Sequence, residues 1–169
     1  MLIVMCGPPG AGKSAVAEAA ARDLPAAVLS VDPVEAALWR AGIDRGQRTG
    51  LAAYSVVHAL AGELLALGQP VLVDAVNDAP EARDAFRDLA AQHAAPLHFV
   101  EVRCPDEELH RRRLEGRRRD LQGFPEPSWE SVRPRRDAFA DWPQPRLVLD
   151  SRRPLHELSA ELVQRVRAA

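Results

Sequence analysis

The residues whose types and spacing could do chemistry are concentrated in one octapeptide, Gly7-Pro8-Pro9-Gly10-Ala11-Gly12-Lys13-Ser14. It fits the pattern G-x-x-x-x-G-K-[ST], in which glycines let successive backbone N–H groups turn toward an anion. The Lys of this pattern reaches the β- and γ-phosphates of a nucleotide, and the hydroxyl after it lies where Mg²⁺ binds. Lys13 is the one Lys among 22 basic residues, so a compact ammonium is needed here. We predict a phosphate-binding loop over residues 7–14, with Ala15 in the helix that follows.

The octapeptide lies between the two elements that such a loop requires. Residues 2–6 are a short apolar run typical of a buried strand, and residues 14–23 have the composition of a helix. That helix would direct the positive end of its dipole at bound phosphates. The alternative is a chance match in a sequence rich in Ala and Gly, and the two flanking elements argue against it.

The rest of the chain alternates short apolar runs with helical segments. We expect further strands at 27–31, 70–75, 97–103 and 146–150, and helices at 33–41, 50–67, 80–93, 106–118, 128–139 and 154–167. Pro134 argues against an unbroken helix at 128–139. The alternation predicts a parallel sheet covered on both faces and joined by right-handed crossovers. Ligands of such sheets bind beyond the carboxyl ends of the strands.

Acidic residues follow two of these strands. Asp32 comes after the strand at 27–31, and Asp74 lies at the end of the third strand, three residues before Asn77. Phosphoryl transfer needs a carboxylate to orient and deprotonate the acceptor hydroxyl, which makes Asp32 the candidate general base. The alternative role of Asp32 is a helix N-cap, with Pro33 at the first helical position. Asp74 is expected either to serve Mg²⁺, as Ser14 does, or to bind the acceptor.

A basic segment at residues 111–119 follows the fourth strand. Arg113 and Arg117 are four residues apart on one helical face, and we expect them in a lid that excludes water and neutralises charge in the transition state. Glycines in this segment should make the lid flexible, and the Pro-rich stretch at 123–127 is expected to be a mobile loop. We expect Arg111, Arg112 and Arg119 to be solvated surface residues. Gly116 and Gly123 are expected to make the lid flexible. Arg133 and Arg136 are expected to close over the site from the other side of the lid.

Composition indicates one domain. A chain of 169 residues with 47% hydrophobic and 27% charged residues can bury a sizeable core. The net charge of −2 gives no overall field that favours nucleic acid, and the basic excess is confined to residues 103–153. Cys6 and Cys104 each end an apolar run and fit free thiols in a reducing cytoplasm. The first apolar run is too short for a signal peptide, and none reaches the length of a membrane span.

In order and spacing these motifs resemble the small P-loop kinases. The resemblance rests on the octapeptide, Leu29-Ser30-Val31-Asp32, Val71-Leu72-Val73-Asp74-Ala75-Val76-Asn77, Arg103-Cys104-Pro105 and Arg113-Leu114-Glu115-Gly116-Arg117. The chain is most similar to the chloramphenicol phosphotransferase-like group, which overlaps polynucleotide kinase. The resemblance implies an α/β P-loop NTPase fold in three α/β/α layers, with a five-stranded parallel sheet and a helical lid near 111–136 in one domain over 1–169. It also implies ATP with Mg²⁺ as cofactors and Asp32 as the general base. Arg113 and Arg117 would lie near the phosphates and the adenine, and Ser151 would lie near the adenine.

One departure bears on the acceptor. Where polynucleotide kinases usually carry an Arg three residues after the catalytic Asp, this chain has Glu35, and a carboxylate there would repel a phosphodiester. With few aromatic residues for base stacking, this disfavours nucleic acid. The acceptor pocket is expected between the second and third strands, from Trp39, Arg40, Arg45, Arg48, Tyr54 and His58, unless the aromatic residues are core and the Arg residues solvated. His93, His98, His110 and His156 have no ligand spacing and are expected to be structural.

The sequence therefore favours a cytoplasmic, ATP-dependent kinase that phosphorylates a hydroxyl of a small molecule such as an antibiotic, a sugar or a nucleoside. A polynucleotide 5′-hydroxyl kinase is the nearest alternative. A nucleotide-dependent ATPase acting on a protein partner is the alternative from another class. The chain has no Asn-Lys-x-Asp sequence, which disfavours a GTPase.

Overall fold

Five short apolar runs form one parallel sheet in the computed structural model, which describes residues 1–118, 121, 124–139 and 142–168. The strands are β1 (Leu2–Cys6), β2 (Ala27–Ser30), β3 (Val71–Asp74), β4 (Leu97–Arg103) and β5 (Leu147–Asp150), in the order β2-β3-β1-β4-β5. Every residue of β1 is buried, because strands pair on both of its sides and helices cover both faces. The predicted fold class is confirmed.

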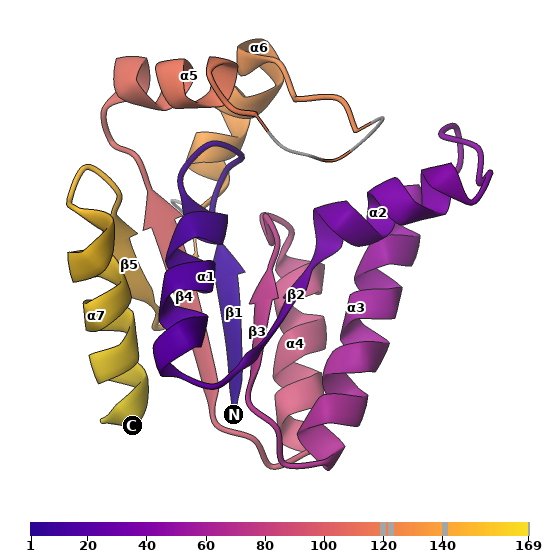
Figure 1. The fold of residues 1–169 in the computed structure, drawn as a ribbon, viewed down its shortest axis with the longest axis vertical. Helices are drawn as coiled ribbons and strands as arrows, with labels where there is room; N and C mark the ends of the chain where they lie inside the picture. The colour runs from indigo at the N-terminus through magenta and orange to yellow at the C-terminus, as the bar shows by residue number, and fades with distance from the viewer. Residues whose placement is uncertain (119–120, 122–123, 140–141, 169) are drawn as a thin grey trace.

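Helices cover the sheet on both faces, as Figure 1 shows. On one face α1 (Lys13–Asp23) and α7 (Leu155–Arg167) pack on a cluster that includes Ile3, Val100 and Leu162. On the other face α3 (Thr49–Ala66) and α4 (Pro80–Gln92) pack on a cluster that includes Val4 and Phe86. α2 (Val31–Arg40) connects β2 to α3.

Three short helices lie over the carboxyl ends of the strands, at the top of Figure 1. They are α5 (Glu107–Glu115), α6 (Trp129–Val132) and the 3₁₀ helix η1 (Arg133–Phe139). α5 is shorter than predicted and ends at the cap residue Gly116. The helix expected at 128–139 changes to 3₁₀ geometry at Arg133, and Pro134 is the reason, because it has no backbone N–H to continue an α-helix. Gly123, Arg119 and part of the expected mobile loop lie outside the described residues.

α3 is the one helix among those described that is long and apolar enough to cross a membrane, and 33% of it is buried. Its buried residues Ala53, Val57, Ala61 and Leu65 belong to the core cluster beneath the sheet. α3 is therefore a partly buried core helix.

Candidate active site

The loop after β1 has the backbone that the glycine spacing predicts. Gly7 has φ of 133°, its N–H donates to the carbonyl of Val76 at 3.0 Å, and a Cβ there would lie 2.4 Å from the carbonyl oxygen of Val102. Gly12 has φ of 104° and is the N-cap of α1. Only glycine fits such conformations without strain, so residues 7–12 form a compact turn at the amino end of α1.

Lys13 begins α1 and is buried, and its Nζ donates to the carbonyl of Pro8 at 3.1 Å. Burial lowers its pKa, and the carboxylates of Asp74 and Asp32 partly oppose this effect. A buried ammonium with one neutral acceptor is a strong attractor for an anion.

Ser14 and Asp74 meet beside this ammonium. Ser14 Oγ donates to Asp74 Oδ2 at 2.7 Å, and Ser30 Oγ donates to the same oxygen at 3.3 Å. Ser30 was not among the predicted site residues, although it lies opposite Asp74 in the register of β2 and β3. No group of three or more His, Cys, Asp or Glu residues that could hold a metal occurs within the described part of the chain.

A cavity of about 370 Å³, called here the phosphate-loop cavity, joins these residues to Asp32 and Arg117. Its lining residues are Pro9, Lys13, Ser14, Glu18, Ser30, Asp32, Pro33, Asp74, Ala75, Val76, Arg117, Arg118 and Leu121. The structure thus brings together the loop, the two predicted acids and one of the two predicted lid arginines. Glu18, Arg118 and Leu121 were missed by the sequence analysis.

Asp32 lies in the first turn of α2, and the N-cap of that helix is Ser30. The alternative role of Asp32 as the N-cap of this helix is therefore wrong, because the helix begins at Val31, before Asp32 and Pro33. Asp32 Oδ2 lies 4.0 Å from Nη2 of Arg117, and its side chain is 40% exposed. Nη1 of Arg117 lies 3.7 Å from Glu126. The carboxylate is accessible from the cavity and faces a cation across it.

Arg113 points away from the phosphate-loop cavity, toward Ser151. Its Nη1 donates to both the carbonyl and the hydroxyl oxygen of Ser151, each at 3.0 Å, after the end of β5. Arg113 and Ser151 thus meet as a pair, outside the lining of the phosphate-loop cavity. Arg111 and Arg112 are exposed and pair with glutamates of their own helix, as a solvated face would.

His110 connects α5 to the phosphate loop. Its Nε2 lies 2.8 Å from the carbonyl oxygen of Pro9, its ring is buried, and it packs edge-on against Trp129. Burial lowers the pKa of His110, so the neutral ring donates through Nε2. Leu114, one turn later, contacts Gly10. His110 was expected to be structural, and its spacing from Arg113 and Leu114 is the signal that places it on the loop-facing side of α5.

Glu35 and Trp39, two residues considered for contact with the phosphate acceptor, join α2 to the start of α3. Glu35 Oε1 accepts from the hydroxyl of Thr49 at 2.7 Å, and that hydroxyl accepts from Trp39 Nε1 at 2.9 Å. Trp39 also stacks on Phe124, with ring centroids 5.0 Å apart, beneath the guanidinium of Arg45. Neither Glu35 nor Trp39 lines the phosphate-loop cavity.

Tyr54 and His58 line a second cavity of about 500 Å³ between α3 and α4. The Tyr54 hydroxyl accepts from the backbone N–H of Asn77 at 3.1 Å, and burial raises the pKa of Tyr54 to about 12. His58 Nε2 lies 3.2 Å from the carbonyl of Ala85. Asn77 is fully buried, and its Nδ2 donates to the carbonyl of Met5 at 2.7 Å. Asn77 therefore fixes the loop after β3, with Tyr54 against its backbone.

Arg133 and Arg136 do not reach the phosphate-loop cavity. Arg136 donates to the carbonyls of Cys104 and Pro105 and pairs with Glu107, which fastens η1 to the turn before α5. Arg133 is exposed, as are the remaining pocket candidates Arg40 and Arg48.

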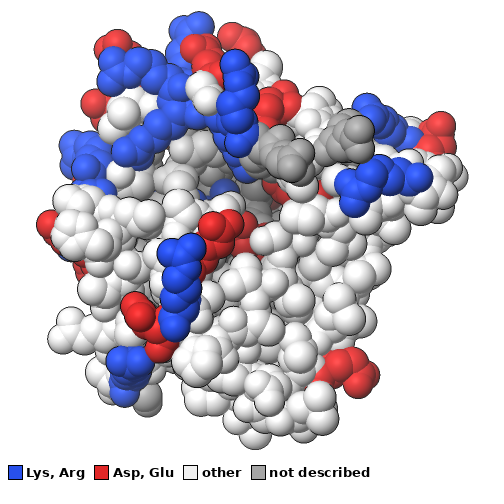
Figure 2. Space-filling view, in the orientation of Figure 1, with Lys and Arg blue, Asp and Glu red and all other residues white. Residues whose placement is uncertain are grey.

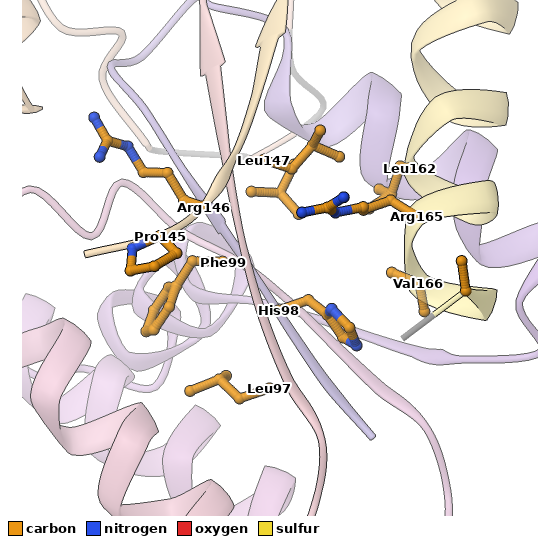
Figure 3. Close-up of a pocket in the computed structure, with 11 residues that line it drawn as sticks. Leu97, His98, Phe99, Pro145, Arg146, Leu147, Leu162, Arg165 and Val166 are labelled. Atoms are coloured by element: carbon orange, nitrogen blue, oxygen red, sulfur yellow. The ribbon is translucent and has the colours of Figure 1, made fainter. Parts of the chain in front are cut away.

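Another cavity, of about 300 Å³, lies at the opposite, amino edge of the sheet. Figure 3 shows His98 and Arg165 on the side of α7, whereas Phe99 and Pro145 lie on the other side of the strand. This hollow follows the edge of β4 and β5 and is remote from the phosphate loop.

Comparisons with known proteins agree with this geometry. The sequence matches the family described as AAA domain (AAA_33) over residues 2–139. No curated protein sequence matches the chain. Similar solved structures include a protein of Chloroflexus aurantiacus (19% identity, 99% of this chain and 96% of that chain, TM-score 0.77). Another is a sugar kinase of Janibacter sp. HTCC2649 (18% identity, 96% of this chain and 92% of that chain, TM-score 0.70). A third is the APS kinase of Mycobacterium tuberculosis in complex with AMPPNP and APS (22% identity, 98% of this chain and 96% of that chain, TM-score 0.70). With its phosphate loop and five-stranded parallel sheet, the chain belongs to this AAA domain family.

Proposed function

We propose that this chain is a kinase that transfers the γ-phosphoryl group of ATP to a hydroxyl of a small molecule. One observation carries the proposal: Lys13, the Ser14–Asp74 pair and Asp32 line a single cavity. Phosphoryl transfer needs these three parts, a triphosphate cradle, ligands for a metal and a base for the acceptor. Support also comes from similar folds that are described as a sugar kinase and as an APS kinase with AMPPNP and APS.

The residues present fit ATP with Mg²⁺. A triphosphate would add negative charge beside the buried ammonium of Lys13, and the N–H groups of the glycine turn would donate to it. Ser14 and Asp74 offer the oxygen ligands that Mg²⁺ prefers, and Mg²⁺ sites on nucleotides use only one or two protein ligands. When bound, Mg²⁺ would neutralise charge on the β- and γ-phosphates.

Asp32 is the proposed base. Its carboxylate takes the proton of the acceptor hydroxyl, the acceptor oxygen bonds to the γ-phosphorus, and the bond to the bridging oxygen breaks so that ADP leaves with the electron pair. Arg117, 4.0 Å from Asp32, brings positive charge to the place where the transferring group would pass. Arg113, held on Ser151, is assigned to the adenine side of the nucleotide.

The acceptor is proposed to be small. Asp32 is open to a hydroxyl from the cavity, and the Tyr54 hydroxyl, which accepts from Asn77, can donate to a ligand near the loop after β3. The net charge of −2 gives no overall field that favours a polyanionic acceptor. A cytoplasmic location is part of this proposal, supported by the free and buried thiols of Cys6 and Cys104.

Mass spectrometry of a metabolite extract incubated with Mg-ATP tests the proposal, in parallel with 5′-hydroxyl oligonucleotides. We expect a new phosphorylated metabolite that forms with the wild type and with Asp88→Asn, an exposed acid on α4, but not with Asp32→Asn. Phosphorylated oligonucleotides would instead support the polynucleotide kinase. ATP consumption with neither product would contradict the proposal and indicate an ATPase.

A further inference from the structure

One side of α3 lies open to solvent although it is apolar. Leu51, Ala52, Val56, Ala59 and Leu60 are exposed, and we call them the outer face of α3. The polar residue Ser55 is exposed among them, and its hydroxyl donates to the carbonyl of Leu51 in the same helix. Figure 2 shows the flank over α3 almost free of charge, in contrast to the crowded charges over α5 and α6. Leu67, just after the helix, extends this strip and is 75% exposed. Large apolar patches on a protein surface mark places where another molecule binds.

Two charges border the outer face, one at each end. Arg48 immediately precedes α3, and Glu63 is the one Asp, Glu, Lys or Arg residue within the helix. Both are exposed, and within the described ranges neither has an ion pair or a side-chain hydrogen bond. They are separated by about 22 Å along the helix axis, at about 1.5 Å per residue. The surface thus has a positive end, an apolar middle and a negative end.

We propose that the outer face of α3 binds a second copy of this chain, with the two α3 helices antiparallel about a two-fold axis between Ser55 and Val56. In this register Arg48 of one copy is level with Glu63 of the other, and the symmetry makes this pair twice. Leu51 is level with Leu60 of the second copy. A parallel arrangement would set each charge beside its own like charge, so electrostatics selects the antiparallel one.

The small side chains on this face favour the same arrangement. Ala52 and Ala59 are level with each other across the axis, and two helices approach closely where side chains are small. None of the outer-face residues lines the phosphate-loop cavity, so the second copy leaves that cavity open, although Leu51 also borders the second cavity with Tyr54. The inference concerns assembly and goes beyond the proposed kinase activity.

Sedimentation equilibrium and light scattering test the proposal. We expect the measured mass of the wild type to rise to that of a dimer as its concentration approaches about 100 µM, which is high enough to detect a micromolar dissociation constant. Leu60→Asp should give a folded monomer. Leu155→Asp on α7 is the matched control, because Leu155 is 45% exposed and Leu60 46%, and it should stay dimeric. Circular dichroism checks that both variants are folded.

Charge reversal tests the register. Glu63→Arg should weaken dimerisation about tenfold or more by setting it against Arg48 of the second copy, and the double variant Arg48→Glu, Glu63→Arg should restore it. A monomeric wild type, a dimer that persists in Leu60→Asp, or a double variant as weak as the single one would overturn the proposal. The measured masses do not depend on enzymatic activity, so failure of the dimer proposal and failure of the kinase proposal are distinguishable.

Discussion

Asp32→Asn separates catalysis from binding, because it removes the charge of the side chain and keeps its shape. Loss of a positioned general base typically lowers a rate about 10²- to 10⁴-fold, or roughly 3–5 kcal/mol of transition-state stabilisation. The cost to folding should be small. The Asp32–Arg117 contact is 4.0 Å long with side chains 40% and 21% exposed, and such a pair contributes about 0.2–1 kcal/mol. No helix cap is lost, because Ser30 is the N-cap.

The assay compares three quantities in the wild type and in Asp32→Asn: turnover, affinity for Mg-ATP by calorimetry, and the free energy of unfolding in urea. We expect turnover to fall by at least about 100-fold while unfolding changes by less than about 1 kcal/mol. Affinity for Mg-ATP should stay equal or rise slightly, since one negative charge near the triphosphate is removed. Asp88→Asn, exposed on α4, should change none of the three.

Two results would refute the reasoning about Asp32. Turnover within tenfold of the wild type would exclude it as the base. A loss of Mg-ATP affinity as large as the loss of turnover would assign Asp32 to nucleotide binding instead.

Three further predictions test the loop and its support. Gly7→Ala should lower the free energy of unfolding in urea by about 1–3 kcal/mol, which is more than for the control Gly42→Ala. Both glycines have a positive φ, but a Cβ at Gly7 would clash with Val102, whereas at Gly42 nothing lies within 4 Å. Equal losses in the two variants would mean that the clash at Gly7 is relieved. Lys13→Ala should abolish measurable binding of Mg-ATP in calorimetry, and unchanged binding would contradict the triphosphate cradle. Because burial holds the pKa of His110 below its ordinary 6.5, the neutral ring stabilises the fold fully above that value, and stability is lost as pH falls below it. His110→Asn should therefore flatten the decline of unfolding free energy between about pH 7 and pH 5, and an unchanged slope would exclude this cause.

Local sequence signals predicted the elements better than their arrangement. The bounds of β4 match the prediction, since a continuous apolar run between turns is a local property. The strand order β2-β3-β1-β4-β5 is not written in any run, and it decides which residues meet. Asp74 was found as a candidate because it ends a strand. Ser30, its neighbour across the sheet, was missed because their contact depends on the register of β2 and β3.

Side chains between β2 and β3 were harder to interpret than those at strand ends. Trp39 was predicted to line the acceptor pocket, and Glu35 to face the acceptor and repel a phosphodiester. The structure places both side chains on Thr49 at the start of α3. A polar side chain on a helix takes its partner from the packing of that helix, and sequence spacing does not reveal it. Tyr54 and His58 do share a cavity, because their spacing of four residues puts them on one face of α3.

The contacts of α5 fasten this helix to the phosphate loop. His110 on Pro9, Leu114 on Gly10 and Arg113 on Ser151 hold the helix itself to the phosphate loop and to the segment after β5. Beyond Gly116, Arg117 contacts Asp32 and Glu126 through partly exposed ion pairs. Lifting α5 would break the buried hydrogen bond of His110 and expose Leu114, which is 2% exposed. We infer that α5 stays on the phosphate loop.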